Sequence, residues 1–302
     1  MDVAATRLTL GAILILLCGC LQFKEQTMSY RHDPDTDRLL LFQDYRGIYG
    51  NDAKGVEGVP LSDKEETQLE SVLSGQRTFF FSNWIDEYTR ADVEKALAGL
   101  RDRSPEDERL SGEEVRKLTE LAELALDKIH IENLGFYVGE GGKVCAAQRV
   151  TISALSKLVQ SLNECGIVFM REFAAEDERT PEDRAATANF IEGAALDFVT
   201  VDGNCLTLHW PLSKASYEKA FCEDSADSSR IAEMRKAGIG ISWKDDVVTF
   251  VIGDVDDRVT RLTLTGNEGH YVTNLLERVR ADKLPLTSLD PEAAAAKFLL
   301  GE

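Results

Sequence analysis

The sequence lacks the motifs by which common catalytic and metal-binding sites are recognised. It contains no C-x-x-C cysteine pair, no H-E-x-x-H histidine pair and no G-x-S-x-G turn, which argues against a thiolate zinc site, a zinc protease of that type and an α/β-hydrolase. The Gly142-Lys143 pair does not belong to a phosphate-binding loop, because Tyr137 replaces the first glycine of that motif and Val144 replaces its serine or threonine. We therefore expect no metal and no cofactor.

Positive charge is scarce as well. The 302 residues include 34 lysines and arginines against 53 aspartates and glutamates, which gives a net charge of −19. A chain this acidic is a poor partner for nucleic acid, whose phosphates bind to basic surfaces. Anionic lipid headgroups would repel it too, so attachment to a membrane would depend on an anchor rather than on a basic patch. After residue 20, no stretch approaches the ~18 consecutive apolar residues that indicate a membrane-spanning helix.

The first twenty residues carry the clearest signal in the chain. Arg7 precedes an apolar run, Leu8 to Leu17, which leads into Leu17-Cys18-Gly19-Cys20. The run is too short to cross a bilayer, which needs ~20 apolar residues, but it has the length of a signal-peptide core. The segment resembles the signal peptide of bacterial lipoproteins, with Cys20 as the cysteine of the lipobox.

This resemblance implies that residues 1–19 are removed and that Cys20 carries the lipid. The mature chain would then lie outside the cytoplasm, anchored to a membrane by its N-terminal lipid. Because Leu21 rather than aspartate follows the cysteine, the resemblance favours the outer membrane in a host with two membranes. An ordinary secretory signal cleaved nearby and an uncleaved N-terminal anchor are the alternatives.

Four cysteines remain when Cys18 is assigned to the signal and Cys20 to the lipid, and an even number in an oxidising compartment suggests two disulfides. They are Cys145, Cys165, Cys205 and Cys222. In each of two similar segments, a cysteine in a strand is followed by a helix and a second cysteine. A strand of six residues advances about 20 Å and a helix of thirteen returns about 20 Å, so each pair would meet. We predict the bridges Cys145–Cys165 and Cys205–Cys222; free buried thiols are the alternative.

The hydrophobic pattern predicts an α+β fold, with a mainly antiparallel sheet of β-hairpins and helices packed on one face. The predicted hairpins turn at 140–142, 202–204 and 244–246, and Ser111 and Glu114 form a capping box that would open a helix. A strand–helix–strand unit would precede this sheet, with a parallel pair of strands at 38–42 and 78–81 and a helix over 62–75 between them. The predicted divisions are a signal peptide at 1–19, a flexible tether at 20–37, the strand–helix–strand subdomain at 38–103, the hairpin and helix domain at 104–285, and a C-terminal tail at 286–302. The tether is inferred from its polar composition, its proline and its lack of apolar periodicity.

One segment combines aromatic, charged and glycine residues where a predicted parallel strand ends. It begins with Asp44, Tyr45 and Arg46, and Asn83 and Trp84 end the neighbouring predicted strand. Ligands of open α/β sheets often bind at such edges. We expect these five residues to border one cleft.

The sequence thus predicts a membrane-anchored extracytoplasmic lipoprotein without catalytic activity, with a binding or envelope-structural role. Its partners would be the membrane, through the N-terminal lipid, and a small ligand or a protein of the envelope. The rival hypothesis is an extracytoplasmic hydrolase that uses carboxylates in the cleft near residues 44–50 and 83–84. A pocket with two or more polarised acids would favour the enzyme, and a flat apolar patch would favour protein binding.

Overall fold

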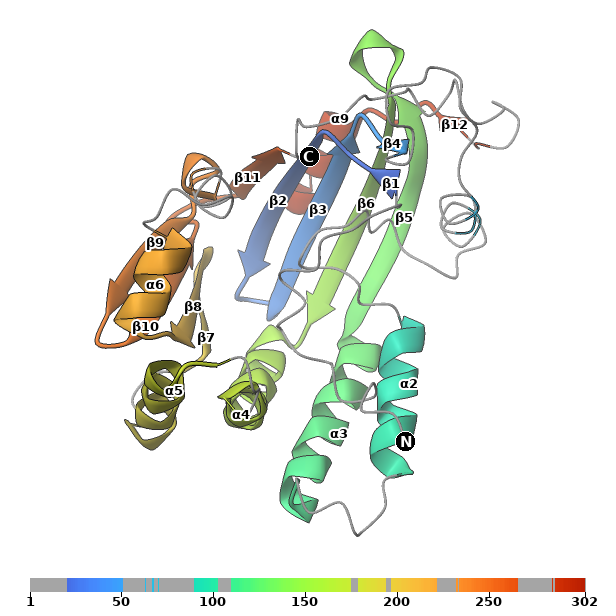
Figure 1. The fold of residues 1–302 in the computed structure, drawn as a ribbon. Coiled ribbons are helices and arrows are strands. Elements are labelled where there is room, and N and C mark those ends of the chain that lie inside the picture. Colours follow the sequence, from blue (N-terminus) through green and yellow to red (C-terminus); the bar gives the residue numbers. More distant parts are fainter. Residues whose placement is uncertain are drawn as a thin grey trace.

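The fold is α+β, as the sequence predicts, and consists of two antiparallel-rich sheets with helices around them (Figure 1). The computed structural model describes residues 21–50, 90–102, 110–174, 179–193, 197–221, 234–265 and 286–301, together with single positions at 63, 67, 70, 232 and 284. The predicted helix over 62–75 and the predicted strand over 78–81 lie almost entirely outside these residues. Within the described part of the chain, no helix is long and apolar enough to cross a membrane.

The larger sheet has six strands in the order β11-β2-β3-β6-β5-β12. They are β2 (Glu25–Asp33), β3 (Arg38–Arg46), β5 (Ile129–Val138), β6 (Val144–Ser153), β11 (Thr260–Thr265) and β12 (Leu286–Thr287). Neighbouring strands are antiparallel except β12 and β5. Two hairpins, β2–β3 and β5–β6, form its centre, so β2 and β6 begin at the same end of the sheet at which β3 and β5 finish.

We call this end of the larger sheet the β1 end, because a short strand pair lies there. β1 (Leu21–Gln22) pairs antiparallel with β4 (Tyr49–Gly50). The tip of the β5–β6 hairpin, with a 3-10 turn at Glu140–Gly142, lies at this end too (Figure 1).

The smaller sheet contains the two hairpins that the sequence predicts around residues 203 and 245. Its order is β7-β8-β10-β9, with β7 (Val199–Asp202), β8 (Cys205–Pro211), β9 (Gly240–Lys244) and β10 (Val247–Ile252). In the β9–β10 turn, Asp245 and Asp246 have φ values of 52° and 59°. Two successive positive φ values are typical of a type I′ hairpin turn, whose twist matches that of the strands.

Side-chain caps mark the starts of the helices α3 (Gly112–Lys128) and α9 (Pro291–Leu300). Further helices are α2 (Arg90–Arg101), α4 (Leu155–Ala174), α5 (Pro181–Gly193) and α6 (Lys214–Phe221). The predicted capping box opens α3: the Glu114 amide donates to the Ser111 hydroxyl at 3.3 Å, and the Ser111 amide donates to the Glu114 carboxylate at 2.7 Å. α9 begins at Asp290, which accepts from two amides, and ends at Gly301 with φ 73°.

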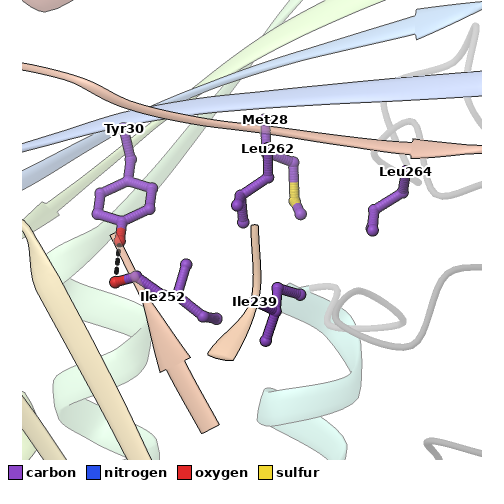
Figure 2. Packing of buried hydrophobic residues seen from close by; sticks show 6 residues of the cluster. All are labelled: Met28, Tyr30, Ile239, Ile252, Leu262 and Leu264. Carbon is purple, nitrogen blue, oxygen red and sulfur yellow. Dashed lines mark hydrogen bonds between the residues drawn. The ribbon is translucent and has the colours of Figure 1, made fainter. Parts of the chain in front are cut away.

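The two sheets share a hydrophobic core. Met28 and Tyr30 from the larger sheet meet Ile252, on β10, and Ile239, which directly precedes β9 (Figure 2). Leu262, on β11, belongs to the same cluster. Because side chains alternate along a strand, the other face of β2 and β3 is free to accept a helix, and α9 packs there against Phe42.

A polar junction beside this core joins the two sheets. The Tyr30 hydroxyl donates to the carbonyl oxygens of Asn204, at 2.8 Å, and Ile252, at 2.9 Å. The Asn204 side chain accepts from the backbone amide of His32 at 2.5 Å and donates to the Asp257 carbonyl at 2.5 Å. These bonds satisfy buried backbone groups of the turns between the sheets and fix the approach of those turns to β2.

The structure corrects the predicted tether at 20–37. Most of this segment forms β1 and β2, and β2 lies inside the larger sheet between β11 and β3. The tail predicted at 286–302 likewise forms β12 and α9, and α9 covers part of the sheet.

The predicted parallel pairing of the strand at 38–42 is also wrong. This strand is part of β3, whose two edges are occupied by β2 and β6, both antiparallel to it.

The predicted Cys145–Cys165 bridge is not formed, because both cysteines are free thiols. The premise that the helix returns beside its strand is wrong here: α4 leaves the far end of β6 and packs against α3, α5 and β7 (Figure 1). Burial raises the pKa of Cys145, and it raises the pKa of Cys165 to about 11. Cys205 is a free thiol as well, and its predicted partner Cys222 lies outside the described residues.

Candidate functional site

A groove of about 360 Å³ lies between α9 and the face of β2, β3 and β11 that α9 only partly covers. Its floor carries alternate residues of the strands, among them Thr27, Ser29 and Asp44. Its apolar wall includes Ala295 and Leu299 from α9. A concave site with an apolar wall and a few convergent polar groups is typical of small-ligand binding.

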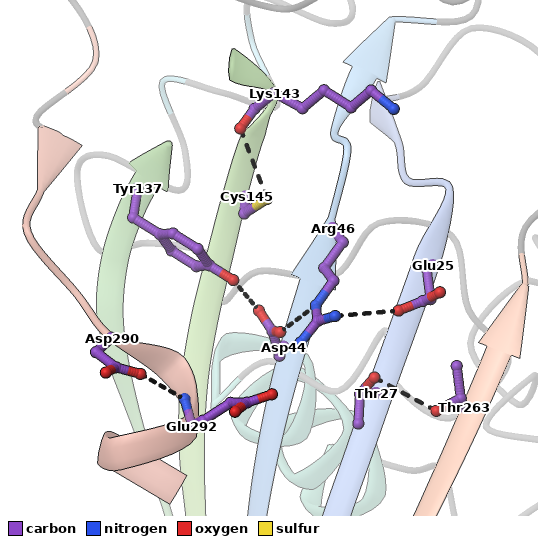
Figure 3. A network of polar contacts seen from close by, with 10 residues as sticks. All are labelled: Glu25, Thr27, Asp44, Arg46, Tyr137, Lys143, Cys145, Thr263, Asp290 and Glu292. Atoms are coloured by element: carbon purple, nitrogen blue, oxygen red, sulfur yellow. Dashed lines mark hydrogen bonds and ion pairs between the residues drawn. The ribbon is translucent and has the colours of Figure 1, made fainter. Parts of the chain in front are cut away.

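Asp44 anchors the polar part of the groove (Figure 3). Its carboxylate is almost fully buried and accepts a hydrogen bond from the Arg46 guanidinium at 2.7 Å and another from the Tyr137 hydroxyl. Burial, followed by the hydrogen bond to Asp44, raises the pKa of the Tyr137 phenol, while the bond to Asp44 raises the pKa of Arg46. Arg46 also lies 3.6 Å from the Glu25 carboxylate.

This arrangement fixes the position of the Asp44 carboxylate at the polar side of the groove. One of its oxygens accepts from the Arg46 guanidinium and the other from the Tyr137 hydroxyl, and each keeps a further lone pair. The other carboxylate that lines the groove, Glu292, is exposed on α9. The groove therefore has one buried, engaged acid rather than the polarised pair that a carboxylate hydrolase requires.

The structure brings together only part of the cleft predicted from the sequence. Asp44 and Arg46 share one face of β3 and both line the groove. Tyr45 lies on the opposite face, 1% exposed, where its hydroxyl donates to Gln43 and its ring meets that of Phe23 edge-on. Asn83 and Trp84 lie outside the described residues.

Ser29 contributes a hydroxyl to the floor of the groove. The residue is 8% exposed, and its side chain makes no hydrogen bond within the described part of the chain. Arg261 lies directly opposite Ser29 on β11, so the two side chains are neighbours on the same face. The Ser29 hydroxyl is therefore available to a ligand or to water in the groove.

The groove also holds charges that the fold does not use. Arg261 on β11 and Glu292 on α9 are both exposed, and neither forms an ion pair with any described residue. By contrast, Arg31 on the same sheet face donates to the Leu299 carbonyl at 2.9 Å. That contact holds the C-terminal end of α9, where a cation is favourable.

Sequence reasoning missed Ser29, Arg261 and Glu292. They come from three distant segments, two of which were predicted to be a tether and a tail. A short polar strand gives no apolar periodicity, and the acid after Pro291 resembles any first-turn residue of a helix. No signal in the single sequence connects them.

Metal chemistry finds no support in the same region. Among the described residues, no group of three or more histidine, cysteine, aspartate or glutamate side chains could hold a metal ion. No protein-family model, no curated protein and no solved structure matches this chain. The groove's own residues therefore carry the evidence for its function.

Proposed function

We propose that this chain is an extracytoplasmic lipoprotein, anchored to a membrane through a lipid on Cys20, that binds a small ligand without transforming it. In a host with two membranes it would occupy the outer one. The observation that carries the binding role is the groove beside α9, where the Ser29 hydroxyl makes no hydrogen bond to any described residue and neither Arg261 nor Glu292 forms an ion pair with one.

The lining of the groove indicates the chemistry of its ligand. Arg261 can bind a carboxylate through charge-assisted hydrogen bonds, and Glu292 can accept from an ammonium group. The apolar wall formed by Val259, Ala295 and Leu299 suits apolar side chains. A zwitterion with an apolar body, such as a short apolar peptide, combines these features. A groove of about 360 Å³ is within the size range of small-ligand sites.

The anchor is tested by growing cells that express the full chain with radiolabelled palmitate. We expect label in the wild-type protein and none in Cys20→Ala, because the lipid would be attached through this thiol. The matched control is Cys18→Ala, which should keep the label. Equal labelling of the wild type and Cys20→Ala, or absence of label from both, would show that Cys20 is not the anchor.

The ligand is tested by titration calorimetry of the full chain in detergent micelles with the dipeptide Leu-Leu. We expect Arg261→Gln and Glu292→Gln each to weaken binding about ten-fold or more, since a hydrogen bond to a charged group contributes roughly 1.5–3 kcal/mol. Lys244→Gln, which removes an 86% exposed charge on β9, should have no effect.

Chemically blocked peptides separate the two charges of the ligand. N-acetyl-Leu-Leu should lose its dependence on Glu292, and Leu-Leu-amide should lose its dependence on Arg261. If the doubly blocked peptide bound with the same affinity as Leu-Leu, the proposed recognition of both terminal charges would be contradicted. Release of free leucine during the titration would contradict a role limited to binding.

A further inference from the structure

We infer that the β1 end of the larger sheet rests directly on the lipid surface, with Val138 and Leu286 in contact with it. This inference rests on the proposed lipid at Cys20 and extends it, because a lipid anchor alone does not orient a domain. It follows from where the fold begins, from what else lies at that end, and from which side chains are exposed there.

The fold begins immediately after the proposed lipid. Leu21 follows Cys20 in the chain and is already part of β1, whose pairing with β4 fixes its backbone. Phe23 is 4% exposed and packs against Tyr45. Since one extended residue spans at most ~3.6 Å, no tether separates the lipid-bearing residue from the domain.

The register of the sheet shows what shares this end with β1. Glu25, at the start of β2, pairs with Arg46 at the end of β3. On β5 and β6, the last and first residues, Val138 and Val144, pair with each other. The hairpin tip between them therefore projects from the same end as β1 (Figure 1). A lipid at residue 20 would place this tip toward the membrane.

Two exposed apolar side chains lie at this end. Val138 is 48% exposed and Leu286 is 39% exposed. Leu286 pairs in parallel with Phe136, so its side chain lies on the same face as Val138 and two residues, about 7 Å, away along the strand direction. Exposed apolar side chains beside a membrane anchor can bury their surface among the headgroups and upper acyl chains.

The remaining large exposed hydrophobic side chains of the described residues lie elsewhere. Ile167 is on α4, beyond the far end of β6. Val255 lies beside Gly203. The carbonyl of Gly203 contacts the ring of His32, which is next to the last residue of β2. Val255 therefore marks the end of the sheet opposite β1, and its 46% exposure makes it a matched control for Val138.

Two exposed lysines at the β1 end fit a lipid surface as well, beside the exposed acid Glu140 at the hairpin tip. Lys24 and Lys143 are both exposed there. Long cationic side chains can extend along an apolar surface and keep their ammonium groups among lipid phosphates. Because the net charge of the chain is −19, a zwitterionic bilayer suits it better than an anionic one.

The test adds one tryptophan at a time to the lipidated full chain, in phosphatidylcholine vesicles that contain brominated acyl chains. The quenching of the wild type, which has three tryptophans of its own, is subtracted. Val138→Trp and Leu286→Trp should show at least two-fold stronger quenching than Val255→Trp, each measured against the same protein in unbrominated vesicles. Equal quenching of Val138→Trp and Val255→Trp would overturn the inferred orientation.

A second measurement needs no substitution. A water-soluble acylating reagent should modify Lys24 and Lys143 several-fold more slowly when the wild-type chain is on vesicles, whereas modification of Lys244, on β9, should not change. Flotation of the vesicles in a density gradient separates the two proposals. A chain that does not float with the vesicles lacks the anchor. A chain that floats, but whose Lys143 is not protected, has the anchor in another orientation.

Discussion

Replacing Gly253 with alanine is expected to destabilise the protein by about 3 kcal/mol. Gly253 has a φ of +76°, where a side chain costs roughly 1–2 kcal/mol. A Cβ atom there would lie 2.4 Å from the Asn204 carbonyl oxygen, 2.5 Å from the Thr260 hydroxyl and 2.8 Å from the Tyr30 hydroxyl. Forcing extra atoms into a packed site typically costs another 1–3 kcal/mol. These three groups form the junction between the sheets, so the methyl group would push the sheets apart.

The substitution Gly238→Ala separates the cost of backbone strain from the cost of steric crowding. Gly238 has a φ of +92°, but a Cβ atom there would meet nothing within 4 Å. Its substitution should therefore lower the free energy of unfolding only by the cost of the backbone conformation, about 1–2 kcal/mol. Urea unfolding of the full chain measures both variants against the wild type. Equal losses for the two variants would mean that the junction has room for the methyl group.

The predictions that succeeded depend on local chemistry. Asp245 and Asp246 can adopt the positive φ values of a tight hairpin turn, and alternating side chains on either side of them define two strands. Ser111 and Glu114 satisfy each other's backbone donors within one helical turn. Such signals are contained within a few residues, so a single sequence reveals them.

The predictions that failed depend on contacts between distant segments. β2 carries Gln26, Thr27 and Ser29 at buried positions, so its polar composition resembles that of a linker. It is a strand because β11 and β3 supply its hydrogen bonds, and they come from other parts of the chain. For the same reason the sequence did not predict the position of α9, because its short apolar segment is stabilised by packing on a sheet.

Only part of the candidate site was predicted, and the reason is related. Once residues 38–46 form one strand, alternation places Asp44 and Arg46 together and Tyr45 opposite them. The sequence had suggested instead a loop after residue 42, in which all three could face one cleft. The site was also expected at the end of a parallel pair, whereas it lies on the face of an antiparallel sheet beside a helix.

Asp183→Asn is expected to destabilise the protein by about 2–3 kcal/mol at pH 7. The Asp183 carboxylate is 6% exposed and joins the starts of two helices. It accepts from the Thr180 hydroxyl at 2.8 Å, at the start of α5. At the start of α6 it accepts from the Ser213 amide at 3.1 Å and the Ser216 hydroxyl at 2.7 Å. Asparagine has the same shape, but it loses the charge that both helix dipoles favour and replaces one acceptor oxygen with a donor.

The pH dependence of this variant tests the role of the charge. Burial alone would raise the pKa of Asp183, but its hydrogen bonds to Ser213, Ser216 and Thr180 outweigh burial and hold the pKa below its ordinary value. A lowered pKa in the folded state means that the stabilisation is complete above the pKa of the unfolded chain, about 3.9, and is lost as the pH falls through the folded value. The difference in unfolding free energy between wild type and Asp183→Asn should therefore be constant near neutrality and shrink below about pH 4. Glu182→Gln removes an exposed charge from the same helical turn and should cost at most about 1 kcal/mol. If the difference for Asp183→Asn stayed constant down to pH 2, the shape of the side chain rather than its charge would join the two helices.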